Sequence, residues 1–208
     1  MPLEPGYGET PVSDDELQWL LPKVHSLFEE PVTKAAVYGL EQAAQVEITE
    51  TLVEEVLDGQ RTLNDLLSDY FLRDLHRWLY GDIWTWAGTY RRHELNIGVD
   101  PQQISVQLRQ SMDTLRWRWE DAGNLTARQL GIAVHAEGVR IHPFTDGNGR
   151  ATRLHADLVF IAAQTGDTLE RYDWELDKKP YIELLREYDR HRNPTDLAAF
   201  IAVQPLSE

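Results

Sequence analysis

The chain has 208 residues, of which 42% are hydrophobic and 26% charged, a composition typical of one globular domain with a sizeable core. A net charge of -15 excludes a general affinity for nucleic acids and anionic membranes, and the absence of cysteine excludes disulfides and thiolate chemistry. No apolar run approaches the ~20 residues of a membrane span, and the N-terminus has no secretory pattern, so we expect a cytoplasmic protein.

Apolar residues recur at helical spacing through most of the chain. A capping-box pattern at Ser13 to Glu16 predicts a first helix that Pro31 ends. Further apolar stripes predict helices over about 33–48, a short one to 57, and a long one over 64–81. Later helices are predicted over 104–119, from the Thr126 capping box to 141, from about 149, around 181–188, and over 197–203.

Thr89 to Val99 breaks this pattern, because β-prone residues alternate there with polar ones. That alternation predicts a short β-hairpin. No repeat and no long linker divides the chain, so we expect a single all-α domain with one β-hairpin. Within it, we assign residues 1–60 to an N-terminal helical extension that could carry a regulatory helix, and residues 61–203 to the core.

The twelve residues 142–153 are the most informative segment, and they read His142-Pro-Phe-Thr-Asp-Gly-Asn-Gly-Arg150-Ala-Thr-Arg153. Because His142 precedes proline, we expect it to be extended and to end the helix before it. The two glycines allow a tight turn and a close approach to a ligand. Helical spacing resumes directly afterwards, which puts the glycine loop at a helix N-terminus, where free N–H groups attract phosphate.

Charged residues in the same segment fit that interpretation. Arg150 and Arg153 fall on one face of the first helical turn, and Asp146 offers the hard oxygen that magnesium prefers beside phosphates. Taken singly, each feature has an ordinary structural explanation, since Asn-Gly is a common turn and paired arginines often face solvent. Their joint occurrence at a loop-to-helix junction favours a nucleotide site.

The segment resembles the signature of the Fic (Fido) domain, His-x-Phe-x-Asp/Glu-Gly-Asn-Gly-Arg-x-x-Arg, and matches every fixed position of it. Trp84–Tyr90 and Leu95–Asp100 resemble the segment before and within the flap hairpin of that family. Tyr181–Leu185 resembles its C-terminal helix. The resemblance covers about residues 71–201, and the layout is most similar to the subgroup called mobile mystery protein B.

This resemblance implies a magnesium-dependent protein adenylyltransferase that moves AMP from ATP onto a Ser, Thr or Tyr hydroxyl of a protein and releases pyrophosphate. His142 would be the general base, a role that suits an imidazole titrating near neutral pH. Asp146 would hold Mg²⁺, and Phe144 would anchor the loop in the core. The residues expected to bind the nucleotide are Gly147, Asn148 including its side chain, Gly149, Arg150 and Arg153.

The flap of the family would hold an extended segment of the target protein as an added strand. The flap residues expected to contact the target are Thr89, Tyr90, Arg91, Asn96, Ile97 and Gly98. Most of the tryptophans, and His135, are expected to belong to the core.

Many Fic proteins carry an inhibitory helix, Ser/Thr-x-x-x-Glu-Gly/Asn, whose glutamate pairs with the second arginine of the signature, here Arg153. No window of this chain matches the pattern fully. Thr51 to Glu55 is followed by Val56, and Glu41 has Val37 where Ser or Thr is expected. Glu41 lies on the better-placed helix, so we choose it over Glu55 as the inhibitory glutamate.

Three alternatives remain open at this point. The donor could be UTP, GTP or a phosphocholine carrier, or the reaction could remove AMP. The helical domain could be a non-catalytic interaction module, which the intact motif disfavours. The chain could also be part of a toxin–antitoxin pair held inactive by a partner, because the subgroup resemblance implies a helix-turn-helix gene neighbour.

Overall fold

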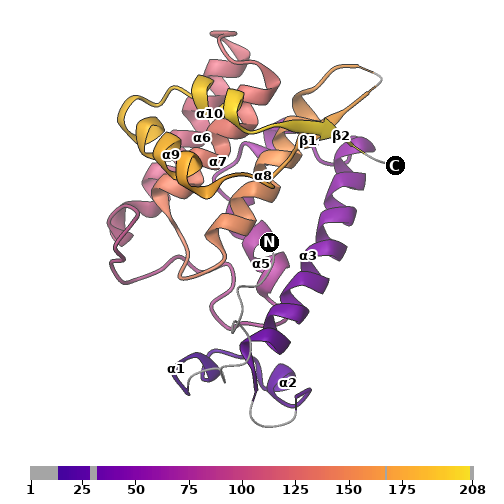
Figure 1. Cartoon of the computed structure of the whole chain (residues 1–208), viewed down its shortest axis with the longest axis vertical. Helices are drawn as coiled ribbons and strands as arrows, with labels where there is room; N and C mark the ends of the chain where they lie inside the picture. Colours follow the sequence, from indigo (N-terminus) through magenta and orange to yellow (C-terminus); the bar gives the residue numbers. More distant parts are fainter. Residues whose placement is uncertain (1–13, 29–31, 167, 207–208) are drawn as a thin grey trace.

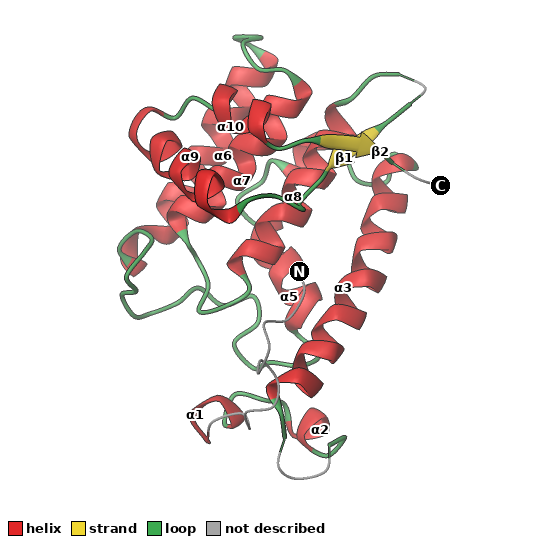
Figure 2. Ribbon diagram, in the orientation of Figure 1, coloured by secondary structure: helices red, strands yellow, loops and turns green. Residues whose placement is uncertain are grey.

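The computed structural model describes residues 14–28, 32–166 and 168–206. Helices dominate, and a small antiparallel sheet joins β1 to β2 (Figure 2), which confirms the predicted all-α class. The elements are α1 (Asp14–Leu17), α2 (Pro22–His25), α3 (Lys34–Leu57), α4 (Leu63–Leu66), α5 (Phe71–Tyr80), a 3-10 turn (Pro101–Gln103), α6 (Ile104–Glu120), α7 (Ala127–Ile141), α8 (Asn148–Ala163), β1 (Glu170–Tyr172), α9 (Lys178–His191), α10 (Thr195–Phe200) and β2 (Val203–Pro205). None of these helices is long and apolar enough to cross a bilayer.

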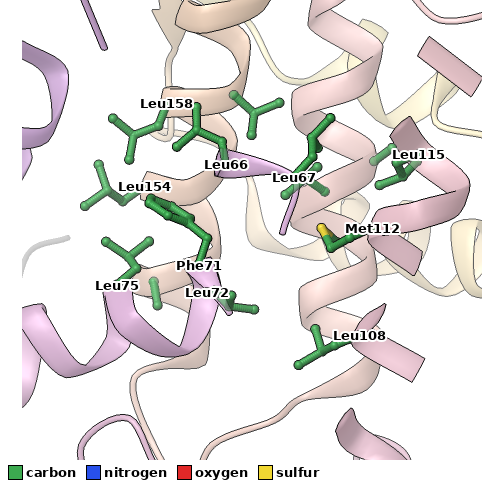
Figure 3. Close-up of a cluster of buried hydrophobic side chains, with 14 of the residues drawn as sticks. Leu66, Leu67, Phe71, Leu72, Leu75, Leu108, Met112, Leu115, Leu154 and Leu158 are labelled. Carbon is green, nitrogen blue, oxygen red and sulfur yellow. The ribbon is translucent and has the colours of Figure 1, made fainter. Parts of the chain in front are cut away.

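The core is built around α7 and α8, which pack closely against each other. Leucine-rich faces of α4, α5 and α6 cover one side of the pair (Figure 3). The labelled residues of this cluster are Leu66, Leu67, Phe71, Leu72, Leu75, Leu108, Met112, Leu115, Leu154 and Leu158. A second cluster joins α7 and α8 to β1, α9 and α10. Apolar burial on both sides therefore fixes the junction between α7 and α8, where the motif lies.

A long helix, α3, runs beside α5 and α8 (Figure 1). The prediction of a helix ending at 48 and a separate short one was wrong, because no glycine or proline interrupts residues 40–57. Thr33 caps the helix by accepting a hydrogen bond from the N–H of Ala36 at 3.3 Å. Leu52 and Val56 enter the main core, so α3 packs with the residues assigned to the core. The boundary at residue 60 remains a prediction.

The N-terminal segment contains two short helices, so the prediction of one helix up to Phe28 was wrong. Pro22 starts α2, and the residue before it, Leu21, is extended at φ -66° and ψ 139°, as proline favours. The N–H of Leu21 then bonds to the carbonyl of Ile83 at 2.9 Å. Ser13 and Pro31, the predicted limits of the helix, lie outside the described residues.

The predicted helix over 64–81 is also divided, into α4 and α5. The hydroxyl of Ser68 donates to the carbonyl of Asp65 at 2.8 Å and accepts from the N–H of Phe71 at 3.2 Å. These local bonds compete with the helical ladder, so the helix stops and restarts at Phe71.

Segment 89–99 contains no paired strand, so the predicted hairpin is absent at this position. The buried guanidinium of Arg91 instead bonds to the carbonyls of His93, at 2.9 Å, and Val99. These carbonyls lie on the two arms that a hairpin would pair. The sheet was missed in the sequence because β1 and β2 have only three residues each and no alternation. The predicted helix over 197–203 ends early, at Phe200, because Val203 already belongs to β2.

The predicted capping box at Thr126 is confirmed, with Thr126 Oγ1 accepting from the N–H of Gln129 at 3.2 Å and Gln129 Oε1 accepting from that of Thr126 at 3.0 Å. Replacing Thr126 by Ala should lower the free energy of unfolding by about 1 kcal/mol, since the cap is lost. Denaturant titration measures this change. Thr114→Ala, at an exposed position on α6, should cost less, and an equal loss in both variants would contradict the assignment.

Candidate active site

His142 lies where α7 ends and the motif begins. It ends the helix as predicted, but its backbone is left-handed, at φ 51° and ψ 63°, and not extended. A non-glycine residue adopts this region rarely, so the surrounding structure must hold it. Arg91 does so from the loop before it, because its Nε donates to the carbonyl of His142 at 2.7 Å and its N–H to that of Pro143 at 2.9 Å.

The loop passes so closely over His142 that only glycine fits at position 98. A Cβ on Gly98, whose φ is +96°, would lie 2.8 Å from the Cβ of His142 and 2.6 Å from Nη2 of Arg91. The side chain of Arg91 is buried against the motif, although the residue also lines the large cavity described below, so its target-contact role remains a prediction. Asn96, Ile97 and Gly98 are exposed, and Thr89 and Tyr90 line the large cavity described below.

The environment of His142 favours a neutral imidazole. Partial burial lowers the pKa of the ring below its ordinary value of 6.5, and the nearby charge of Arg91 lowers it further. Neutral imidazole can accept a proton at physiological pH, which is the state that a general base needs.

Phe144 anchors the motif loop in the core, as predicted, and stacks on His76 with ring centroids 3.7 Å apart. The sequence interpretation missed His76. Its Nδ1 accepts from the N–H of Gly88 at 2.9 Å, so the proton of the neutral ring is on Nε2, which donates to the carbonyl of Asp146 at 3.0 Å. Burial lowers the pKa of His76 to about 4, which keeps this tautomer at neutral pH. The sequence could have indicated this role, because His76 lies among the aromatic residues Phe71, Trp78 and Tyr80 of α5.

The glycine loop leads into the N-terminus of α8, as the motif predicted. Gly147 has a φ of 75°, and a Cβ there would lie 2.6 Å from the ring of Tyr80, so glycine is required. The predicted phosphate contact of the Asn148 side chain was wrong. Its Oδ1 accepts from the N–H of Phe144 at 2.9 Å and its Nδ2 donates to the carbonyl of Phe144 at 2.8 Å. Asn148 thus holds the loop closed and leaves the backbone N–H groups of the helix start for a ligand.

The two motif arginines have different surroundings. Arg150 forms an ion pair with Glu41 through Nη1 and lies 3.6 Å from Asp146 Oδ2 through Nη2. Arg153 lies above the ring of Trp174, 5.8 Å from its centroid, and its Nη2 is 3.7 Å from where a Cβ of Gly149 would be. Both guanidinium groups are therefore held near the start of α8.

Glu41 lies on α3, 109 positions before Arg150 in the sequence, and is 5% exposed. Its second oxygen, Oε1, accepts from Nε1 of Trp84 at 2.6 Å. The predicted partner of Glu41, Arg153, was thus wrong, because the carboxylate meets Arg150 at the first arginine of the motif. Glu55 pairs with Arg61 at 2.5 Å instead. Only Glu41, of the two candidates, contacts a motif arginine.

A cavity of about 1440 Å³ lies beside the motif, and His142 is not among the residues that line it. Its wall includes Asp146, Arg150, Arg153 and Glu41, together with parts of the N-terminal segment and of loop 84–93. The Asp146 side chain is 70% exposed and could join substrate phosphates in binding Mg²⁺, which usually takes one or two protein carboxylates. The described residues hold no cluster of three metal-ligating side chains, so a metal would depend on the nucleotide as well. His135 is a buried core residue, as predicted, bonded to Tyr181 Oη at 2.6 Å.

Comparisons with known proteins agree with this geometry. The Fic/DOC family pattern matches residues 66–160. Those residues form a Fic/DOC family domain. The protein adenylyltransferase Fic of Nematostella vectensis is 26% identical over 170 residues, covering 79% of this chain and 36% of that protein. The protein adenylyltransferase fic-1 of Caenorhabditis elegans is 35% identical over 81 residues, covering 36% of this chain and 15% of that protein. The chain thus spans about a third or less of these curated relatives.

Solved structures share the Fic fold. A Fic domain-containing signalling protein from Bacteroides thetaiotaomicron has a TM-score of 0.56 at 27% identity, covering 77% of this chain and 62% of that one. BepC of Bartonella tribocorum, solved with bound AMPPNP, has a TM-score of 0.61 at 17% identity, covering 94% of this chain and 100% of that one, and it supports the fold alone. The narrower resemblance to mobile mystery protein B remains a prediction.

The lowered pKa of His142 makes a prediction about pH. Protonation removes the base, so any group transfer that depends on His142 should persist below pH 6.5, with the acid limb of kcat/KM centred below that value. The limb is measured between about pH 5 and pH 8. Nucleotide binding over the same range is the control, because the phosphates titrate too. A His142-dependent limb centred at or above 6.5 would contradict the assignment.

Proposed function

We propose that this Fic domain transfers AMP from ATP to a Ser, Thr or Tyr hydroxyl of a protein and releases pyrophosphate. One observation carries the proposal: the loop that begins at His142 leads to the N-terminus of α8, where two arginines and an exposed carboxylate line one cavity. The names of the curated relatives, both protein adenylyltransferases, support the same reaction class.

In this mechanism, His142 takes the proton of the attacking hydroxyl as its oxygen approaches the α-phosphorus. The bond between the α-phosphorus and the bridging oxygen breaks, and pyrophosphate leaves with the electron pair. Negative charge grows on the phosphate oxygens during this step, so fixed donors are most useful there. The N–H groups at the start of α8, Arg150 and Arg153 would supply them.

Asp146 would hold Mg²⁺ against the nucleotide phosphates, and the bound ion would neutralise part of their charge. The exposure of its carboxylate and its place on the cavity wall fit this role. His76 fixes the backbone of Asp146, so the carboxylate starts from a defined position.

The target segment would lie along loop 89–98, where backbone groups can add a strand. Thr89 and Tyr90 would line its path within the cavity, and Asn96 and Ile97 would contact it at the exposed part of the loop. Gly98 keeps the loop close to His142, so a hydroxyl held there would come near the base.

Glu41 would restrain this activity in cis. Its carboxylate occupies Arg150, and a phosphate must displace it to gain the same guanidinium, since both are anions that use the same donors. Trp84 holds Glu41 in place through its indole N–H.

Replacing His142 by Ala should lower transfer by ~10²–10⁴-fold, the usual contribution of a general base, while ATP binding changes little. Labelled ATP incubated with the protein and a cell lysate measures transfer, and calorimetry measures binding. His191→Ala, at an exposed position on α9, is the matched control. Near-parental transfer by the His142 variant would remove the base assignment.

Replacing Glu41 by Gly should raise automodification at least several-fold and tighten ATP binding, because Arg150 is released. Glu55→Gly is a matched control on the same helix, with the same loss of about 1 kcal/mol of helix propensity but no contact with the motif. The two variants are compared by label incorporation. Equal behaviour of both variants would refute restraint by Glu41.

A further inference from the structure

The wall of the large cavity includes an arginine outside the motif. Arg171 lies on β1 and lines the same cavity as Arg150 and Arg153. The motif does not include it, and neither the matched family segment, which ends at residue 160, nor the proposed mechanism uses it. Lys34, Arg91 and Arg92 line the cavity as well. A further arginine on a wall where phosphates are expected needs an explanation, because the chain carries a net charge of -15.

The backbone next to Arg171 is fixed to α8 at the turn that contains Asp157. Asp157, one turn beyond Arg153, accepts from the N–H of Tyr172 through Oδ1 at 3.1 Å and from Nε1 of Trp174 through Oδ2 at 2.9 Å. These bonds fix the end of β1 to that turn. Because helical positions 150, 153 and 157 share one face, the backbone of Arg171, next to Tyr172, lies further along α8 from the glycine loop than Arg150 and Arg153 do. These three arginines, which all line the cavity, are called the arginine row below.

The charges along this row are unevenly balanced. Arg150 has Glu41 and Asp146 beside it. In the part of the chain that the structure describes, neither Arg153 nor Arg171 is within ion-pair distance of a carboxylate. The charges of Arg153 and Arg171 both lower the pKa of Asp157. Burial has the larger effect and raises this pKa to about 7, so Asp157 is only partly ionised at neutral pH. Positive charge is thus in excess at the outer end of the row.

We propose that Arg171 is a phosphate-binding residue that, with Arg153, contacts the outermost phosphate of a nucleoside triphosphate. This inference rests on the proposed function and deepens it. Phosphates that start at the N-terminus of α8 extend along the row, and the third one meets the unbalanced cations. The site then selects donors with three consecutive phosphates over diphosphate-linked carriers.

The experiment uses the full chain with Glu41→Gly, which frees Arg150, and measures binding of ATP, ADP and AMP by calorimetry with magnesium present. Adding Arg171→Gln should weaken ATP about tenfold or more, the usual effect of losing a hydrogen bond to a charged group, and change ADP and AMP much less. Arg171→Lys should keep most of the preference for ATP over ADP. Arg186→Gln, at an exposed position on α9 outside the cavity, should change nothing.

The outcomes separate the two proposals. If Arg171→Gln keeps the parental ratio of ATP to ADP affinity, or weakens all three nucleotides equally with a lower Tm, Arg171 only balances Asp157 and the inference is overturned, while the proposed function stands. If the Glu41→Gly chain itself binds no nucleotide, both are overturned. A selective loss for ATP with an unchanged Tm supports the inference.

Discussion

Buried backbone carbonyls must find donors, and this requirement governs the junction between α7 and α8. Arg91 donates from its backbone and side chain to the carbonyls of His142 and Pro143. Asn148 donates to that of Phe144, and His76 to that of Asp146. Three side chains from three separate segments thus hold an irregular loop, including a left-handed histidine, in one conformation. Without these donors the carbonyls of the loop would have to reach solvent, and His142 would lose its position at the end of α7.

The same three residues explain which parts of the site could be predicted from the sequence. The glycine loop, the helix that follows it and the burial of Phe144 depend on local rules, so the motif predicted them correctly. The side-chain roles of Asn148 and Arg91 depend on carbonyls that become buried only when α7 packs on α8. A local pattern contains no information about that burial, so it did not reveal that both side chains satisfy the protein's own backbone.

Helix limits were predicted well where a cap or a glycine marks them and poorly elsewhere. Thr126 was identified through its reciprocal bonds with Gln129, which are local. The break at Ser68 depends on a hydroxyl that bonds to the backbone and not to solvent. The break before Pro22 is stabilised by the bond from the N–H of Leu21 to Ile83, a residue far along the chain. Helix limits of this kind follow from tertiary contacts, because the intrinsic helix propensities of single residues differ only slightly.

The Glu41–Arg150 pair would connect the proposed restraint of the site to its chemistry through one guanidinium. A buried carboxylate is stable only with its hydrogen bonds made, and both oxygens of Glu41 are satisfied, by Trp84 and by Arg150. A phosphate that took Arg150 would leave Glu41 half satisfied, and that cost would oppose the proposed nucleotide binding. The apparent affinity falls in proportion to the fraction of molecules in which Arg150 is free. Any event that moves α3 away from α8 would raise that fraction, so in the proposed mechanism the packing of α3 would determine how strongly the site is restrained.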